Sequence, residues 1–238
     1  MKITVQFVSF SIAGIGKLNE DSWGCRALED GSFVAVVADG VGGNYGGSIA
    51  SALAVESALD SLSSNPALPL ETALEIASEA LKKRGATDLI SGQMATTLSL
   101  CIVQKSGRVD VVHVGDSRIY HLRRQGILQK TKDQTEVAAL VAAGILSNEQ
   151  AKTYPRRTVL RSALSAKGNY ETFRTEFQLE KNDRIVLLTD GAYRLVSKMT
   201  LRDLSIQCAT IEELLAALTI EIKDANDDDA TAIIIEAT

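Results

Sequence analysis

Aspartates at the ends of apolar segments are the residues of this sequence best suited to carry chemistry. Asp39 and Asp190 each follow an apolar run and precede a glycine, which lets the backbone turn and a ligand approach closely. Carboxylates that gather repel one another and lose hydration, and a hard divalent cation removes both costs. A site of oxygen ligands without His or Cys suits Mg²⁺ or Mn²⁺ rather than zinc. The aspartates in such settings are Asp21, Asp39, Asp116, Asp190 and Asp228.

The same residues also have an ordinary structural interpretation. Asp-Gly is a common hairpin-turn dipeptide, and the run Asp227–Asp229 is typical of a solvated loop. For any one aspartate this interpretation is the simpler one. The five together favour a binding site, but their spacing alone does not show that they converge.

The composition limits the kinds of chemistry that are open to the chain. Its 238 residues are 45% hydrophobic and 23% charged, which is typical of a globular protein with a core of its own. Only 2 His are present, so chemistry that needs several histidines is nearly excluded. The formal net charge of −5, without any basic run, argues against nucleic acid or an anionic membrane as a partner.

The cysteines and the N-terminal segment indicate a cytoplasmic protein. Cys25, Cys101 and Cys208 are far apart and form no C-x-x-C pair, which argues against a disulfide framework. Residues 1–10 alternate as a strand does and lack the apolar core of a secretion signal. No run approaches the ~18 apolar residues of a membrane span, so we expect no membrane insertion.

The hydrophobic patterns predict an α+β fold. We expect one domain over residues 1–238, because no linker-like stretch divides the chain. Runs of strands with helices inserted in pairs indicate antiparallel sheets, and the three β-like runs between 95 and 123 predict a meander. Residues 18–22 are expected in a loop. Strands are predicted over 1–10, 32–38, 95–104, 108–114, 118–123, 172–179, 184–189 and 230–236, and helices over 48–62, 70–83, 135–143, 147–152 and 210–223.

Six segments resemble the motifs of the metal-dependent protein phosphatase family, type 2C, in its short bacterial form. They occur in the family's order and span nearly the whole chain, and residues 128–166 resemble the family's flap region. The resemblance implies a four-layer α-β-β-α sandwich, with a binuclear metal centre between two antiparallel sheets flanked by helices. The segments are Asn19–Asp21, Val37–Gly43, Ala95–Thr97, His113–Tyr120, Leu188–Gly191 and Asp228–Ala232.

The resemblance also implies a role for individual residues. Asp39 would bridge two metal ions, with the Gly40 carbonyl as a further ligand, and Asp190 and Asp228 would complete the catalytic ligand set. Two bound Mg²⁺ or Mn²⁺ ions would lower the pKa of a shared water and offset the charge on the phosphate oxygens. The implied activity is hydrolysis of phosphoserine and phosphothreonine in phosphorylated proteins, which are targets of a Ser/Thr kinase.

Further residues have supporting roles in the same pattern. Glu20 and Asp21 would hold metal-bound waters, and Asp116 would join Asp190 at a weaker third metal site. Counting back from Thr231 makes Asp228 the ligand, although a shift by one residue within Asp227–Asp229 stays open.

The sequence departs from the family pattern at the places that would contact phosphate. Val41 stands where many eukaryotic members have a proton-donating His, so the general acid is unassigned. Gly16 stands where members have an Arg that grips phosphate, and Ser11 replaces an acidic residue further upstream. Lys17 is the nearest cation, and we expect it either to take part of that role or to be a solvated loop residue. An ammonium does not readily replace a bidentate guanidinium.

Two other functions remain as alternatives. A catalytically impaired relative could bind a phosphoprotein or a regulatory partner without turnover, which the missing Arg favours and the intact aspartate set opposes. An acidic calcium-binding module would need the loop Asp-x-Asp-x-Asp-Gly with a later Glu, which this sequence lacks.

Overall fold

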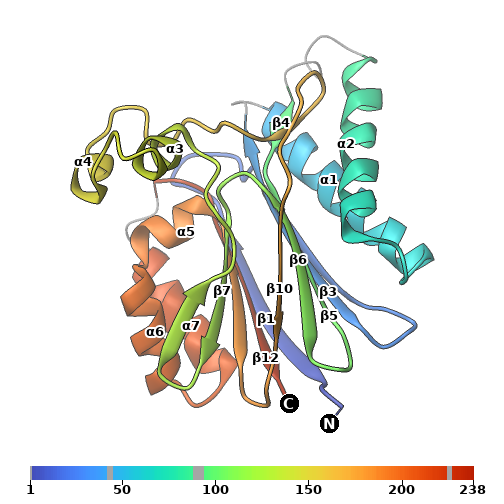
Figure 1. Cartoon of the computed structure of the whole chain (residues 1–238), viewed down its shortest axis with the longest axis vertical. Helices are drawn as coiled ribbons and strands as arrows, with labels where there is room; N and C mark the ends of the chain where they lie inside the picture. The colour runs from blue at the N-terminus through green and yellow to red at the C-terminus, as the bar shows by residue number, and fades with distance from the viewer. Residues whose placement is uncertain (1, 42–44, 88–93, 224–226) are drawn as a thin grey trace.

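Two antiparallel β-sheets lie face to face at the centre of the computed structural model, which describes all residues except 1, 42–44, 88–93 and 224–226 (Figure 1). The first sheet contains β1 (Val5–Ile12), β7 (Arg118–Arg123), β8 (Gly126–Gln129), β11 (Arg184–Leu188) and β12 (Ala230–Ala237). The second contains β2 (Asp21–Ala27), β3 (Phe33–Val41), β4 (Ala95–Thr96), β5 (Leu98–Val103), β6 (Arg108–Val114), β9 (Leu164–Ser165) and β10 (Phe173–Gln178). The helices are α1 (Tyr45–Ser64), α2 (Leu70–Gly85), α3 (Glu136–Ala142), α4 (Asn148–Lys152), α5 (Asp190–Leu195), α6 (Lys198–Gln207) and α7 (Ile211–Lys223).

The sheets and helices form four layers. The first sheet has the order β1-β12-β11-β7-β8, and the second has the order β10-β6-β5-β3-β4-β9 with β2 paired to β3. Helices α1 and α2 cover the second sheet, while α5, α6 and α7 lie against the first (Figure 1). This confirms the expected α+β sandwich of two antiparallel sheets flanked by helices.

Burial on both faces explains the unbroken apolar runs in the central strands. In β3, Val34 and Val36 face α1 and α2, whereas Ala35 and Val37 face the other sheet. A strand that is buried on only one face would alternate apolar and polar residues instead. The predicted helical face of 70–83 is likewise buried, from Leu70 to Leu81.

The predicted meander from 95 to 123 is wrong at its last step. Strand β6 pairs with β5 and β10, but β7 pairs with β11 and β8 in the other sheet. The chain crosses between the sheets at Gly115, whose φ of +111° is a conformation that L side chains rarely adopt. Asp116 follows directly, so the crossover carries this aspartate to the edge of the sandwich.

Three further expectations about the elements are corrected. Asp21 begins β2 and is not in a loop, and its Cα partner across the ladder is Asp39. Asp39 lies within β3 rather than at its end. The sequence patterns did not predict α5 and α6, because Asp190 and its following glycine are more typical of a turn than of a helix start. The side chain of Ser197 caps α6 by accepting a hydrogen bond from the N–H of Thr200, at 3.1 Å.

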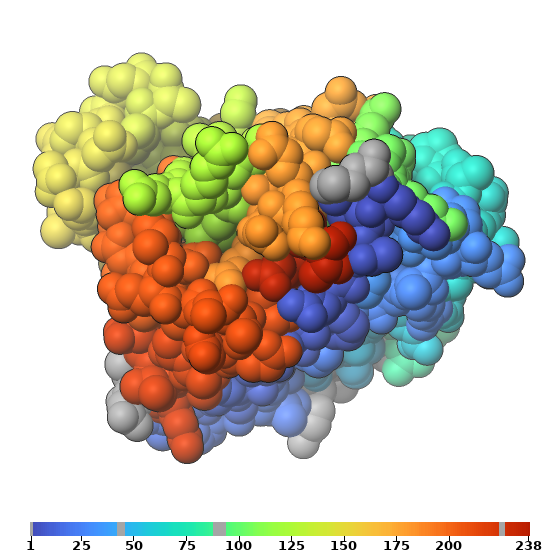
Figure 2. All heavy atoms as spheres, turned by 90° about the horizontal axis from the view of Figure 1, so that it is seen from below, coloured from blue at the N-terminus to red at the C-terminus, as the bar shows by residue number. Residues whose placement is uncertain are grey.

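The chain termini lie together at one end of the sandwich (Figure 1), where Val5 in β1 pairs with Ala237 in β12. Figure 2 views the molecule from that end, with the segment containing α3 and α4 projecting at one side. Among the described residues, no helix has both the length and the apolar character needed to cross a membrane.

Candidate functional site

The acidic residues meet in a pocket at the end of the sandwich opposite the termini. Its volume is about 660 Å³. The walls come from β3, the β6–β7 crossover, the start of α5, the approach to β12 and the segment before β9. The lining residues are Asp39, Gly40, Val41, Asp116, Thr158, Val159, Leu160, Ala163, Asp190, Arg194 and Asp228.

The backbone of Asp39 is held on both sides. Its N–H donates to Thr97 Oγ1 at 2.9 Å, and its carbonyl accepts from the Thr97 N–H and from Thr96 Oγ1, both at 2.9 Å. These contacts fix the point from which the carboxylate reaches the pocket. Burial, followed by the negative charges of Asp190 and Asp21, raises the pKa of Asp39 well above its usual range.

Gly40 is required by close packing. A Cβ at this position would collide with the carbonyl of Gly47 and would lie 2.6 Å from the carbonyl oxygen of Glu20. The Gly40 N–H donates to that same Glu20 carbonyl at 3.1 Å. The first turn of α1 therefore approaches β3 next to Asp39 only because residue 40 has no side chain.

Asp21 lies beside Asp39 on the neighbouring strand. Its Oδ2 accepts a hydrogen bond from Thr189 Oγ1 at 2.7 Å. Burial raises the pKa of Asp21 to about 7, with the hydrogen bond from Thr189 opposing the shift.

Asp116 forms another wall of the pocket. Tyr193 Oη donates to Asp116 Oδ2 at 3.3 Å, and the Arg118 guanidinium stacks on the Tyr193 ring at 3.7 Å from its centroid. Arg118 is in turn paired with Asp133 at 2.6 Å. Burial, then the charges of Asp190 and Asp133, raise the pKa of Asp116 to about 7. The tyrosine and arginine thus hold this carboxylate in place through stacking and hydrogen bonding.

Asp190 and Asp228 share a guanidinium. Arg194 forms an ion pair with Asp190 and a second one with Asp228 at 3.2 Å. Burial raises the pKa of Asp190, and Arg194 opposes that shift. The sequence interpretation did not single out Arg194, although its position four residues after Asp190 is the spacing of a helical ion pair. Lys17, which the sequence indicated, lies with its Nζ 3.5 Å from Asp228 Oδ1.

The neighbouring aspartates 228 and 229 face in different directions. The Asp229 carboxylate accepts the N–H of Gly14 at 2.8 Å and the N–H of Glu20 at 2.7 Å. Asp229 therefore binds the 14–20 segment to the start of β12, while Asp228 lines the pocket. A side chain at Gly191 would collide with the Asp229 carbonyl, so α5 also packs closely here.

Of the positions that depart from the family pattern, Val41 lines the pocket, whereas Gly16 is not among its lining residues. Gly16 is exposed, with a φ of +72°, and Val41 is 39% exposed at the pocket rim. His113 is buried, with Nδ1 bonded to Ser99 Oγ at 2.7 Å and Nε2 to the Gly115 carbonyl at 2.9 Å. Both ring nitrogens of this histidine are thus engaged within the protein.

The donor set fits a divalent cation. Glu20 Oε1 and Asp21 Oδ1 are buried acceptors without a hydrogen-bond partner among the described residues, an arrangement that is costly unless a positive group or a water satisfies them. The raised pKa values of the pocket aspartates have the same origin, a crowd of carboxylates away from water. Within the described ranges, no three His, Cys, Asp or Glu side chains are already arranged to hold a metal ion.

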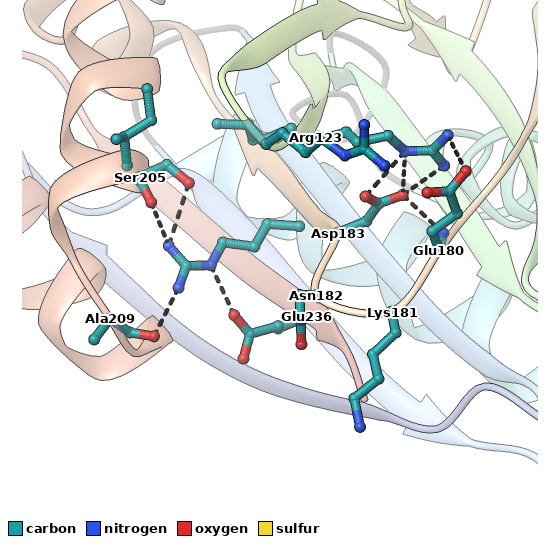
Figure 3. A pocket seen from close by; sticks show the side chains of 12 residues that line it. Arg123, Glu180, Lys181, Asn182, Asp183, Ser205, Ala209 and Glu236 are labelled. Atoms are coloured by element: carbon teal, nitrogen blue, oxygen red, sulfur yellow. Dashed lines mark hydrogen bonds and ion pairs between the residues drawn. The ribbon is translucent and has the colours of Figure 1, made fainter.

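A second hollow of about 610 Å³ lies at the opposite end of β7 and β11 (Figure 3). Five of the seven charged residues that line it are paired with one another. Asp183 accepts from Arg123, and Arg184 bonds to Glu236 at 2.8 Å and to the Ser205 carbonyl at 2.8 Å. These contacts are those of a satisfied structural network, so the carboxylate pocket is the stronger functional candidate.

Solved bacterial phosphatases share this fold and extend over the whole chain. The serine/threonine phosphatase PstP/Ppp of Mycobacterium tuberculosis has a TM-score of 0.87 and 28% identity, covering 98% of both chains. A structure of the PstP catalytic domain in complex with 2 manganese ions has a TM-score of 0.85 and 26% identity, covering 99% of both chains. The fold is that of phosphoprotein phosphatases, which are hydrolases.

Sequence comparison narrows this class to one family. The family model described as protein phosphatase 2C matches residues 12–219 of this chain. The serine/threonine phosphatase Stp of Listeria welshimeri is 31% identical over 232 residues, which cover 92% of this chain and 90% of the relative. The chain belongs to the protein phosphatase 2C family, and the resemblance identified from the motifs is confirmed.

Proposed function

We propose that this chain is a Mg²⁺- or Mn²⁺-dependent protein phosphatase that hydrolyses phosphoserine and phosphothreonine. The observation that carries the proposal is the meeting of Asp39, Asp116, Asp190 and Asp228 in one pocket, from four separate parts of the chain. The names of the relatives support the serine/threonine specificity. The relative that contains 2 manganese ions supports the metal dependence.

The same residues would hold the ions. Asp39, the Gly40 carbonyl, Asp190 and Asp228 would hold two divalent cations. When bound, such ions lower the pKa of a shared water and offset the negative charge of the phosphate. Glu20 and Asp21 would hold metal-bound waters through their unpartnered buried oxygens. Asp116 and Asp190 would contribute a weaker third site.

The protein itself positions these groups. Thr97 fixes the backbone of Asp39, Thr189 orients Asp21, and Asp229 anchors the segment that leads to Glu20. Val41 and Val159 line the pocket with apolar side chains that are 39% and 37% exposed. These rim side chains would contact the peptide chain on either side of a phosphorylated residue.

The remaining parts of the proposal concern the cellular setting. Residues 1–238 would act as one catalytic domain, and its partners would be phosphorylated proteins made by a Ser/Thr kinase. A cytoplasmic location is part of the proposal, supported by three cysteines that are free of disulfide bonds.

A turnover assay tests the proposed activity. p-Nitrophenyl phosphate and a phosphothreonine peptide would be assayed with Mn²⁺, with and without chelator, for the wild type and Asp39→Asn. We expect turnover that is abolished by the chelator. Asp39→Asn should reduce this turnover at least ~100-fold, because a bound metal ion contributes several kcal/mol of transition-state stabilisation and Asp39 would be one of its ligands. Asp60→Asn, at an exposed residue on α1 paired with Arg26, is the matched control and should retain full activity.

The same assay tests the alternative of an impaired, phosphoprotein-binding relative. Absence of turnover at every metal concentration, combined with binding of the phosphothreonine peptide, would reject the enzyme in favour of that alternative.

A further inference from the structure

Arg194 lies among the carboxylates that would bind metal. It extends from α5, one helical turn after Asp190, and lines the pocket together with Asp39, Asp116 and Asp228. Among the described residues, its ion-pair partners are Asp190 and Asp228. A guanidinium therefore already neutralises two of the proposed metal ligands.

The guanidinium contacts carboxylate oxygens to which a metal ion would also bind. Arg194 contacts Oδ2 of Asp190 and, at 3.2 Å, Oδ2 of Asp228. The other oxygen of Asp228 accepts the N–H of Asp229 at 3.1 Å and lies 3.5 Å from Lys17 Nζ. Asp228 thus has both oxygens engaged, and a cation that binds it must displace or share one of these partners.

The positive charge of Arg194 weakens the binding of a metal ion to these two carboxylates. A positive guanidinium beside the two carboxylates offsets part of the charge that attracts a metal ion, and it repels the ion directly. The Arg194 side chain is 37% exposed, so it has room to turn away from the pocket into water. Displacement therefore requires a rotation of one side chain without unfolding of α5.

We propose that Arg194 is an internal counter-cation of the metal site, which binds the Asp190–Asp228 pair and sets the affinity of the site for divalent cations by competing with them. The inference rests on the proposed function, because it takes Asp190 and Asp228 as metal ligands. It goes beyond that function by assigning to this chain a residue that opposes metal binding and is released by it.

Metal titration tests the proposal without any turnover. Isothermal titration calorimetry with Mn²⁺ alone would be performed on the full chain as wild type, Arg194→Gln and Arg194→Lys. Arg202→Gln is the matched control, because Arg202 is a partly exposed arginine on α6 that pairs with Asp203. Melting temperatures would be recorded for each protein in chelator and in Mn²⁺.

Competition predicts tighter binding when the guanidinium is removed. We expect Arg194→Gln to lower the Kd for Mn²⁺ about tenfold, which corresponds to about 1.4 kcal/mol. Arg194→Lys should give a smaller change than Arg194→Gln, because the ammonium keeps the positive charge although it cannot bridge two carboxylates as a planar guanidinium does. In chelator, Arg194→Gln should melt below the wild type, and Mn²⁺ should raise its melting temperature by more than it raises that of the wild type.

The outcomes separate this inference from the proposed function. An unchanged or weaker Mn²⁺ affinity in Arg194→Gln would overturn the counter-cation role while leaving the metal-dependent phosphatase intact. Failure of both the wild type and Arg194→Gln to bind Mn²⁺ would overturn both proposals. If Arg194→Gln does not fold, the Arg194→Lys titration decides, and an affinity no tighter than that of the wild type rejects the role.

Discussion

Because Asp228 and Asp229 make different contacts, we expect substitution of Asp229 to lower the stability of the protein and substitution of Asp228 to weaken metal binding. Asp229 is 8% exposed and accepts two backbone N–H groups, from Gly14 and Glu20. Asp228 has a side chain that is 41% exposed and pairs with Arg194 and Lys17. We therefore compare Asp228→Ala with Asp229→Ala in metal-free protein.

The contacts give the expected magnitudes. Each buried N–H that loses its acceptor costs about 1–3 kcal/mol, so two such groups cost roughly 2–6 kcal/mol. The loss of the Asp229 charge relieves repulsion on Asp21 and Glu20, which offsets part of that cost. We expect a net loss of about 3 kcal/mol for Asp229→Ala. Asp228→Ala should cost less, about 1 kcal/mol, because it removes exposed ion pairs and one N–H contact, that of the adjacent Asp229.

Urea denaturation in chelator measures both free energies of unfolding. Asp227→Ala, at the exposed neighbouring position, is the control and should be close to the wild type. Calorimetric titration with Mn²⁺ then completes the comparison: Asp228→Ala should bind the ion more weakly, whereas Asp229→Ala should keep the stoichiometry of the wild type. Equal destabilisation by both substitutions, or loss of Mn²⁺ binding only in Asp229→Ala, would refute the division of roles.

Two further predictions concern the scaffold around the pocket. Burial lowers the pKa of His113 from 6.5 to about 4. As the pH falls below 6.5, the unfolded chain therefore binds a proton at this histidine that the folded protein does not yet bind, and the free energy of unfolding decreases. Between pH 7 and pH 5, metal-free wild type should lose about 2 kcal/mol more than His113→Gln does, as measured by urea denaturation; an equal loss would contradict the assignment. Gly191→Ala should lose at least about 2 kcal/mol of stability, because its Cβ would lie 2.9 Å from the Asp229 carbonyl carbon. A Gly191→Ala protein as stable as the wild type would show that α5 can move away from β12.

Local patterns predicted most of the elements because their physical causes are local. The capping box at Ser147 is present, with the Gln150 N–H donating to Ser147 Oγ at 3.2 Å and the Ser147 N–H donating to the Gln150 side chain at 2.9 Å. The apolar run at 32–38 forms β3, and the helical face that begins at Leu70 is buried. In each case the side-chain period or the cap lies within a few residues of the element that it defines.

The missed elements depend on contacts far away in the sequence. Strand β2 forms because it pairs with β3, and nothing in residues 18–22 indicates that partner. Helix α5 begins at Asp190, where the glycine needed for packing against Asp229 also resembles a turn. The sequence between β6 and β7 is typical of a hairpin, yet these two strands belong to different sheets.

The sequence by itself determined the chemistry of this protein: the carboxylates, the scarcity of histidine, the ordered motifs and through them the family. Only the tertiary structure decided which groups each carboxylate contacts. It separates Asp228, in the pocket, from Asp229, which binds two backbone N–H groups, and it brings Arg194 onto Asp190 and Asp228. The reason is physical, since residue type fixes which ligands a side chain can bind. Its charge environment and orientation depend on strands and loops that meet only when the two sheets pack together.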